Sequence, residues 1–212
     1  MQAGRAIAIL AARSVPSLGG TLLVALPAAA EDIPAPPALA NSVGVEVAPE
    51  LRTRTGALVD GYAKANGSHT FDSGLIWGGS FQLTNRVEGF QQYQPETTVG
   101  YNIKLDQIWS IPVSAGVGYR WDENPNAKPS HQLAYYVVNA GLNMKISESW
   151  TWNVVSARYR DAFEGGWQTP KVTTGLSYAI DRQNSVYGNV GYAWRNGQPN
   201  KISVAAGYKY GF

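Results

Sequence analysis

Hydrophobic and polar residues alternate with a period of two over most of this chain. The clearest example runs from Trp109 to Asp122 (WSIPVSAGVGYRWD), where odd-numbered residues are apolar and even-numbered ones are small, polar or charged. Because successive side chains of a β-strand point to opposite sides, this alternation predicts a strand with two unlike faces. Trp109 and Trp121 end its apolar row, about 40 Å apart along an extended strand. Once tilted, such a strand matches the thickness of a bilayer and both of its interfaces.

The same alternation predicts strands in other parts of the chain. Clear cases cover residues 43–54, 97–106, 131–146, 171–181, 184–195 and 201–212. A helical period is not evident, and no stretch reaches the roughly 18 apolar residues typical of a membrane-spanning helix. The pattern therefore predicts an all-β protein.

Two further segments alternate less regularly. Ile76 interrupts the polar row of residues 73–84. In the segment that begins at Trp150, Arg158 and Arg160 fall in the apolar row. A β-bulge near residues 154 and 155 would reverse the faces midway and return both arginines to the polar side.

The predicted strands are even in number. Eight follow residue 71, and residues 43–54 and 57–66 add a pair, so we predict ten strands, with eight as the alternative. The second member of that pair alternates weakly, and its Asp60 has to point to the polar side. An even number is what a closed antiparallel barrel needs when both chain ends lie on one side.

The connections between these strands fall into two groups. Tight turns are predicted at residues 106–108, 147–149 and 181–185, and longer connections at 85–96, 122–130 and 163–170, with a Gly- and Pro-containing turn at 196–200. Outer-membrane barrels have this arrangement, with short turns at the periplasmic rim and longer loops outside. We expect the tight turns and both chain ends at the periplasmic rim.

The N-terminal residues have the order of a secretory signal. Arg5 and Arg13 precede a short apolar run at residues 18–30, which ends in three alanines just before Glu31. A positive segment, an apolar segment and a small-residue cleavage site are typical of signal peptides. We expect residues 1–30 to be the signal peptide, 31–42 a Pro- and Ala-rich periplasmic leader, and 43–212 the barrel.

Composition and charge exclude several other classes of protein. Charged residues make up only 15% of the chain, below the roughly 25% of ordinary soluble proteins. Removal of the signal peptide takes two of the 17 basic residues and none of the 15 acidic ones, which leaves a formal charge of zero. This argues against a nucleic-acid-binding protein, which carries a basic surplus. The chain has no cysteine, so disulfides and thiolate metal sites are excluded.

The last predicted strand ends in an aromatic row. Its members are Val204, Ala206, Tyr208, Tyr210 and Phe212. Only helices and closed barrels satisfy all backbone polar groups within lipid, and aromatic rings favour the interface. We therefore expect this row to face lipid, with the terminal phenylalanine at the periplasmic rim. A soluble barrel, with the apolar row inside, is the alternative.

This closing segment resembles the C-terminal signature of bacterial outer-membrane β-barrel proteins. The resemblance covers the closing strand specifically and the rest of the chain only as a general pattern. It implies a closed, antiparallel, up-and-down transmembrane β-barrel in the bacterial outer membrane, in contact with lipid and lipopolysaccharide. It also implies that the barrel-insertion machinery binds this segment during biogenesis. The subfamily and the oligomeric state stay open.

The polar face of the predicted strands carries many charges. Candidates for the lumen lining are Glu46, Glu50, Arg52, Arg54, Asp60, Lys104, Arg120, Lys145 and Lys209, joined by Lys171 and, if the bulge exists, Arg158 and Arg160. Side chains nearly fill a barrel of eight or ten strands, so we favour a packed network of ion pairs that plugs the interior. A narrow polar pore whose basic surplus favours anions is the alternative.

A lipid-modifying enzyme is a further alternative, and it needs a nucleophile, a base and an acid near the outer rim. Asp122 and Ser130 lie at the two ends of a predicted outer loop, and His131 follows it. Neighbours on one loop rarely align for catalysis, and His69 belongs to the opposite rim, so we predict no enzymatic activity. The two histidines are far apart in sequence, and we expect neither a metal nor a cofactor.

The first functional hypothesis is accordingly a structural or surface-interaction role. The three longest outer loops would face outward, and their Phe90, Tyr93 and Trp167 are candidates for binding a partner or for lying at the lipopolysaccharide boundary. The second hypothesis is a narrow porin-like channel for small solutes or ions. The third is the lipid-modifying enzyme.

Overall fold

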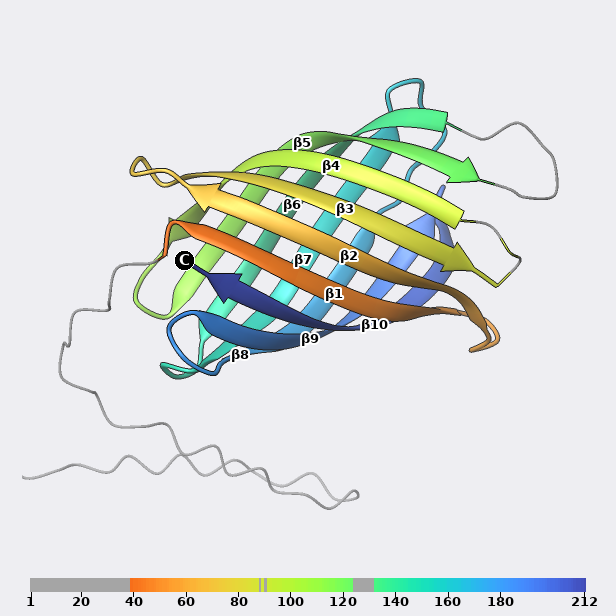
Figure 1. Cartoon of the computed structure of the whole chain (residues 1–212). Coiled ribbons are helices and arrows are strands. Elements are labelled where there is room, and N and C mark those ends of the chain that lie inside the picture. Colours follow the sequence, from red (N-terminus) through yellow and green to blue (C-terminus); the bar gives the residue numbers. More distant parts are fainter. Residues whose placement is uncertain (1–38, 88, 90, 124–131) are drawn as a thin grey trace, which may run out of the picture. The chain divides into compact units, whose positions relative to one another are not determined.

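The computed structural model describes residues 39–87, 89, 91–123 and 132–212, and ten strands close into an antiparallel barrel (Figure 1). The strands are β1 (Asn41–Arg52), β2 (Leu58–Thr70), β3 (Leu75–Arg86), β4 (Gln91–Lys104), β5 (Trp109–Glu123), β6 (Gln132–Lys145), β7 (Trp150–Ala162), β8 (Lys171–Ala179), β9 (Asn184–Arg195) and β10 (Gln198–Gly211). Each strand pairs with its neighbours in the sequence, and β1 pairs with β10. The predicted ten-stranded fold is confirmed. The predicted signal peptide lies outside the described residues.

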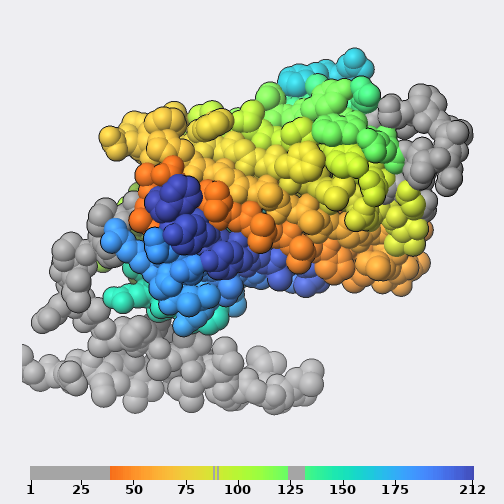
Figure 2. All heavy atoms as spheres, viewed as in Figure 1, coloured from red at the N-terminus to blue at the C-terminus, as the bar shows by residue number. Residues whose placement is uncertain are grey.

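The first and last strands close the barrel. Val43 pairs with Tyr210, and Val45 with Tyr208, along the seam between β1 and β10. The backbones of Asn41 and Phe212 exchange two hydrogen bonds of 3.0 Å. Pairing therefore starts at residue 41, two residues before the predicted start of the barrel. Figure 2 shows β1 in orange and β10 in dark blue side by side on one face.

The apolar row of each strand points away from the barrel interior. In β5, Val117 and Tyr119 are 48% and 40% exposed, whereas Arg120 between Tyr119 and Trp121 is only 6% exposed. The ring of Trp121 stacks on Tyr93 of β4 at a centroid distance of 5.2 Å, on the same outer face. A barrel with an apolar outer wall and a charged interior satisfies its backbone within lipid. The predicted orientation is confirmed.

A bulge in β7 restores the lumen face of that strand. Asn153 pairs with Gly175 of β8 but Ser156 pairs with Thr173, so one extra residue lies between them. Pairing with β6 shifts at the same place, where Leu142 lies opposite Val155. The predicted bulge is confirmed, and it is the reason that Arg158 and Arg160 line the interior.

Short connections join the strands at the rim that carries Asn41 and Phe212. They are residues 71–74, 105–108, 146–149 and 180–183. In the last of these turns the Asp181 carboxylate accepts hydrogen bonds from the Asn184 side chain and from the backbone of Asn184 and Gln183. These bonds stabilise the charged form and lower the pKa of Asp181.

At the other rim the connection at residues 163–170 has its predicted bounds, whereas two other connections are shorter than predicted. The expected loop 85–96 is wrong, because Gln92, Gln94 and Glu96 continue the alternation and pair within the sheet, so β4 already begins at Gln91. β5 ends at Glu123, one residue beyond the predicted end, and β9 and β10 meet at residues 196 and 197 instead of across 196–200. Asn196 and Gly197 both have positive φ, 49° and 78°, as a two-residue hairpin turn requires.

Candidate functional site

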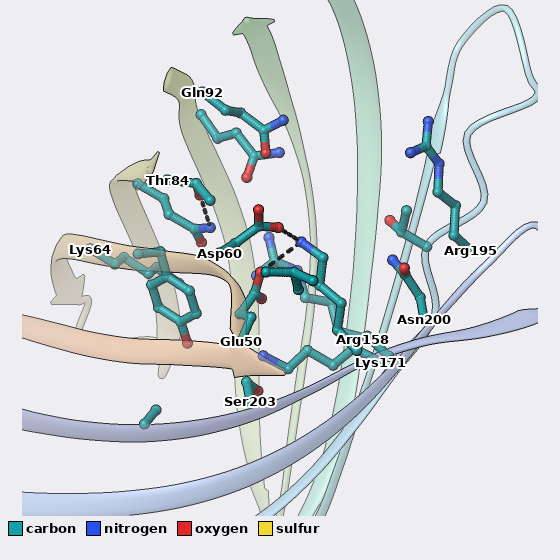
Figure 3. A pocket seen from close by; sticks show the side chains of 18 of the residues that line it. Glu50, Asp60, Lys64, Thr84, Gln92, Arg158, Lys171, Arg195, Asn200 and Ser203 are labelled. Carbon is teal, nitrogen blue, oxygen red and sulfur yellow. Dashed lines mark hydrogen bonds and ion pairs between the residues drawn. The ribbon is translucent and has the colours of Figure 1, made fainter. Parts of the chain in front are cut away.

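A cavity of about 620 Å³ occupies the interior on the side of the longer loops. Leu58, Val87 and Arg195 line it at the rim, and Asn139 and Asn189 line it near the middle of their strands. The lumen is therefore hollow over this part of its length. Side chains from different strands project into the space and converge there (Figure 3).

Basic residues dominate the cavity wall. Nine line it, namely Arg52, Lys64, Arg86, Arg120, Arg158, Arg160, Lys171, Arg195 and Lys201. Three acidic residues line it: Glu46, Glu50 and Asp60. Glu96 and Asp122 are bound to arginines of this set, so the basic side chains outnumber the acidic ones even when these two are included.

One ion-pair group joins the two ends of the chain. The Lys201 Nζ of β10 lies 2.8 Å from Glu50 Oε2 and also contacts the Asp60 carboxylate (Figure 3). Nearby, the Tyr62 hydroxyl donates a 2.7 Å hydrogen bond to Glu46. Buried charges need such partners, and this group holds β1, β2 and β10 together within the lumen.

A second group spans the lumen between β4 and β7. The Arg158 guanidinium is paired with the Glu96 carboxylate, and Glu96 Oε2 also accepts a 3.1 Å hydrogen bond from the Tyr135 hydroxyl. The Tyr135 ring fits because its partner in the register, Gly118, has no side chain; a Cβ there would overlap the ring. Glycine therefore makes room for a bulky lumen residue, as it does at Gly207 beside Tyr187.

A third group lies close to the loop rim. Arg120 donates through Nε to Asp122 Oδ1 at 2.9 Å, and its terminal nitrogen contacts the other carboxylate oxygen. Gln92 donates to Asp122 Oδ1 at 2.8 Å. Arg86 and Arg195 also lie within electrostatic range of this carboxylate. Three guanidinium groups thus share one acidic residue near the opening of the barrel.

Residues 163–170 fold back toward the lumen. Asp161 Oδ1 accepts hydrogen bonds of 2.9 Å from the backbone N–H groups of Ala162 and Trp167. The Trp167 ring is 6% exposed and packs on Tyr135 at a centroid distance of 5.1 Å, with Arg120 and Arg160 over its faces. The expectation that Trp167 faces outward is wrong, because these contacts bury it.

The predicted lumen residues occupy different environments. Glu46, Glu50, Arg52, Asp60 and Arg120 line the cavity, together with Lys171, Arg158 and Arg160. Lys209 lines a second cavity of about 230 Å³ at the rim that carries the chain ends. Lys104 and Lys145 are exposed at the ends of their strands near that rim.

Arg54 does not belong to the lumen. It lies exposed in the turn after β1, because the Thr55 and Gly56 N–H groups bond back to Arg52 and reverse the chain there. Conversely, the sequence interpretation did not single out Lys64, Arg86, Glu96 or Lys201. The available signal was that these residues alternate in step with other lumen-facing residues of their strands. For Lys64 the alternation is weak, and Arg86 and Glu96 lie at the two ends of the predicted loop 85–96, so the signal was missed.

The residues weighed for the enzyme alternative are only partly within the described part of the chain. Ser130 and His131 lie outside them, and Asp122 is bound to Arg120 and Gln92. His69 Nδ1 lies 2.8 Å from Asn41 Oδ1 at the rim of the chain ends. In the described part of the chain, no cluster of His, Asp and Glu has the makings of a metal site. The described part of the chain also contains no helix that is long and apolar enough to span a membrane.

Comparison with known proteins gives relatives in fold alone. Neither a protein-family model nor a curated protein matches this sequence. Among solved structures, an outer membrane channel from Pseudomonas putida F1 has a TM-score of 0.55 at 8% identity, covering 88% of this chain and 100% of that chain. The translocator domain of autotransporter NalP from Neisseria meningitidis has a TM-score of 0.51 at 10% identity, covering 85% and 91%.

The fold is therefore that of bacterial outer-membrane β-barrels. It combines a closed antiparallel sheet, an apolar outer wall and a polar interior. Closure pairs the backbone groups around the ring, and the apolar side chains make the outer face compatible with hydrocarbon. The chain is a protein of the bacterial outer membrane.

Proposed function

We propose that this protein forms a narrow passage across the outer membrane that prefers small anionic solutes. The observation that carries the proposal is the lining of the cavity, in which nine basic side chains face three acidic ones. Fixed charge of one sign in a confined lumen raises the local concentration of the opposite ion and sets selectivity. This favours the pore over the fully packed plug expected from barrel size.

The half of the lumen near the chain ends supports a continuous path. Many of its lumen-facing residues are small; examples are Ser80, Thr98, Ser114, Gly116 and Ser177, and each is partly exposed. Tyr187 and Lys209 are the larger side chains that also project into this half. Small side chains leave room along a barrel axis that larger ones would fill. A second cavity, about 230 Å³ in volume, lies at the same end. The charged groups described above then form the narrow, selective section.

Conductance in planar bilayers tests the proposal. We expect discrete channels whose reversal potential in a salt gradient indicates anion preference. Arg195→Gln removes a cation from the cavity rim and is expected to lower that preference several-fold. Arg54→Gln removes the same charge from the exposed turn at that rim and serves as the matched control. A preference for cations in the unmodified protein would contradict the proposal.

A silent barrel with a structural or surface-interaction role is the second candidate. The observation that favours it is Trp167, whose buried ring lies among Arg120, Arg160 and Tyr135 at the loop end of the cavity. If the unmodified protein does not conduct, Trp167→Ala distinguishes a closed passage from a solid plug. Channels that appear only in the variant indicate a passage closed by this ring, whereas silence in both indicates the structural role.

The outer surface is proposed to contact lipid and lipopolysaccharide directly. Tyr93, Trp121 and Phe81 form an aromatic cluster on the outer face near the loop rim. Such rings favour the interface between hydrocarbon and head groups. At the opposite rim Phe212 is 53% exposed and stacks on Tyr210, which leaves the end of β10 accessible to the insertion machinery. Enzymatic activity forms no part of the proposal.

A further inference from the structure

Four hydrogen-bond donors meet on one part of the cavity wall, where β7 adjoins the start of β8. Arg158 and Arg160 project from the same face of β7. Arg158 lies directly opposite Lys171 in the register, and the backbone N–H of Thr169 donates to the Arg160 carbonyl at 2.9 Å. All four side chains line the cavity, and Figure 3 shows Arg158 beside Lys171. We call these four residues the donor patch.

The donor patch is electrostatically unfavourable as it stands. Like charges directly opposite each other on neighbouring strands destabilise a sheet, and Arg158 and Lys171 are such a pair. Arg160 and, from β2, Lys64 add positive charge within range of Arg158. Among the described residues, the salt bridge of Arg158 with Glu96 is the one carboxylate contact made by the patch. Glu46 and Glu50 lie within electrostatic range of Lys171, but in the described part of the chain neither makes an ion pair with the patch.

Three donors of the patch are also left without an acceptor. The Nε atoms of Arg158 and Arg160 and the Thr169 Oγ1 are buried, and none has a hydrogen-bond partner within the part of the chain that the structure describes. A buried donor without a partner costs free energy that folding has to offset elsewhere. Three of them on adjoining residues indicate a place for a group rich in acceptor oxygens.

Neighbouring rings fix the position of the central cation. The Arg160 guanidinium lies 5.7 Å from the Tyr135 ring centroid and 5.1 Å from that of Trp167. Trp167 is itself held by the Asp161 carboxylate through its backbone N–H. A guanidinium held in this way loses little conformational freedom when it binds a ligand. The patch is therefore preorganised rather than a set of mobile surface charges.

We propose that the donor patch binds a small dianionic oxyanion of the phosphate or phosphate-ester class. Such a group offers several acceptor oxygens and two charges, which match the guanidinium and ammonium groups of the patch and the Thr169 hydroxyl. A monocarboxylate provides fewer acceptors and half the charge. The site lies inside the lumen, and its occupation does not require that the lumen conducts.

Calorimetric titration of the folded barrel in a zwitterionic detergent with inorganic phosphate tests the proposal. At about 0.1 M sodium chloride, where distant charges are screened, we expect saturable binding of one phosphate and at least tenfold weaker binding of acetate. Arg160→Gln removes a charged donor without stranding a paired carboxylate and is expected to weaken phosphate binding roughly tenfold. Lys104→Gln, which removes an exposed charge at the far rim, is the matched control.

A second variant keeps the test informative if Arg160→Gln does not fold. Thr169→Val preserves shape and charge and removes only the unpaired hydroxyl, so we expect a several-fold loss of phosphate affinity. The absence of saturable phosphate binding in the unmodified protein, or unchanged affinity in both variants, would overturn the site. If phosphate binds but the barrel does not conduct, the proposed phosphate site is supported and the proposed channel is rejected. If the barrel conducts anions selectively but does not bind phosphate, the channel is supported and the phosphate site is rejected.

Discussion

At the scale of single residues, the lumen depends on where side chains are missing. Tyr135 is fully buried in the interior and donates to Glu96, but it reaches that position only because Gly118 opposite it has no Cβ. A glycine in a strand is otherwise costly, since it packs nothing and loses more entropy on folding. Here the cost of Gly118 is offset by the packing of the Tyr135 ring and by its hydrogen bond to the Glu96 carboxylate.

We therefore expect Gly118→Ala to destabilise the barrel. The new Cβ overlaps the Tyr135 ring, which has to move and weaken its hydrogen bond to Glu96. Overpacking of this kind costs about 1–3 kcal/mol, to be measured by denaturant unfolding in micelles. Gly79→Ala is the control, because its nearest contact would be an ordinary 3.9 Å and the residue is exposed. Equal stability of both variants would show that the ring moves without cost.

At the scale of strands, one extra residue in β7 decides where two arginines lie. The bulge separates Asn153 from Ser156, so that Trp152 faces outward before it and Arg158 and Arg160 face inward after it. A one-residue shift exchanges the two faces of a strand. The donor patch and the salt bridge to Glu96 both exist because of this shift.

Deletion of Val154 is accordingly expected to abolish assembly of the barrel. Without the bulge, either the arginines or the aromatic end of β7 has to exchange faces. An arginine on the lipid face costs roughly 2–4 kcal/mol at the bilayer midplane and less toward the interface, and two arginines are involved. Folding yield in detergent or lipid vesicles measures the effect. Deletion of Glu164, in the exposed turn that follows β7, is expected to be tolerated. Normal assembly without Val154 would mean that the register adjusts elsewhere.

The strands also indicate how far alternation alone predicts a structure. The period of two identified the fold, the outward direction of the apolar row and the bulge, because lipid enforces these features in every strand. The start of β4 was misplaced, because Gln91, Gln92, Gln94 and Glu96 were interpreted as part of a polar loop. Alternation placed Arg120 correctly, but only strand pairing reveals that Arg158 lies opposite Lys171, and only the folded structure reveals that Trp167 turns inward.

At the scale of the whole molecule, a nearly neutral chain separates its charges in space. The formal charge is only +2, yet nine basic and three acidic side chains line the cavity. At the rim of the chain ends the charges balance, because Asp72, Asp106, Glu148 and Asp181 of the short turns are matched by Lys104, Lys145, Arg182 and Lys209 in or beside them. The basic surplus is therefore local to the cavity, where the net charge of the chain does not reveal it.

This separation predicts how ion selectivity depends on salt. If the proposed passage selects ions by the field of its basic lining, raising the ionic strength from about 0.1 M to about 1 M shortens the screening length from roughly 10 Å to 3 Å. The anion preference measured from reversal potentials is then expected to fall markedly. A preference that persists at high salt would point instead to direct binding at the donor patch, whose closely spaced, partly buried groups are screened much less. The two origins are separated by Arg160→Gln, which should reduce the salt-resistant part and leave the salt-sensitive part largely in place.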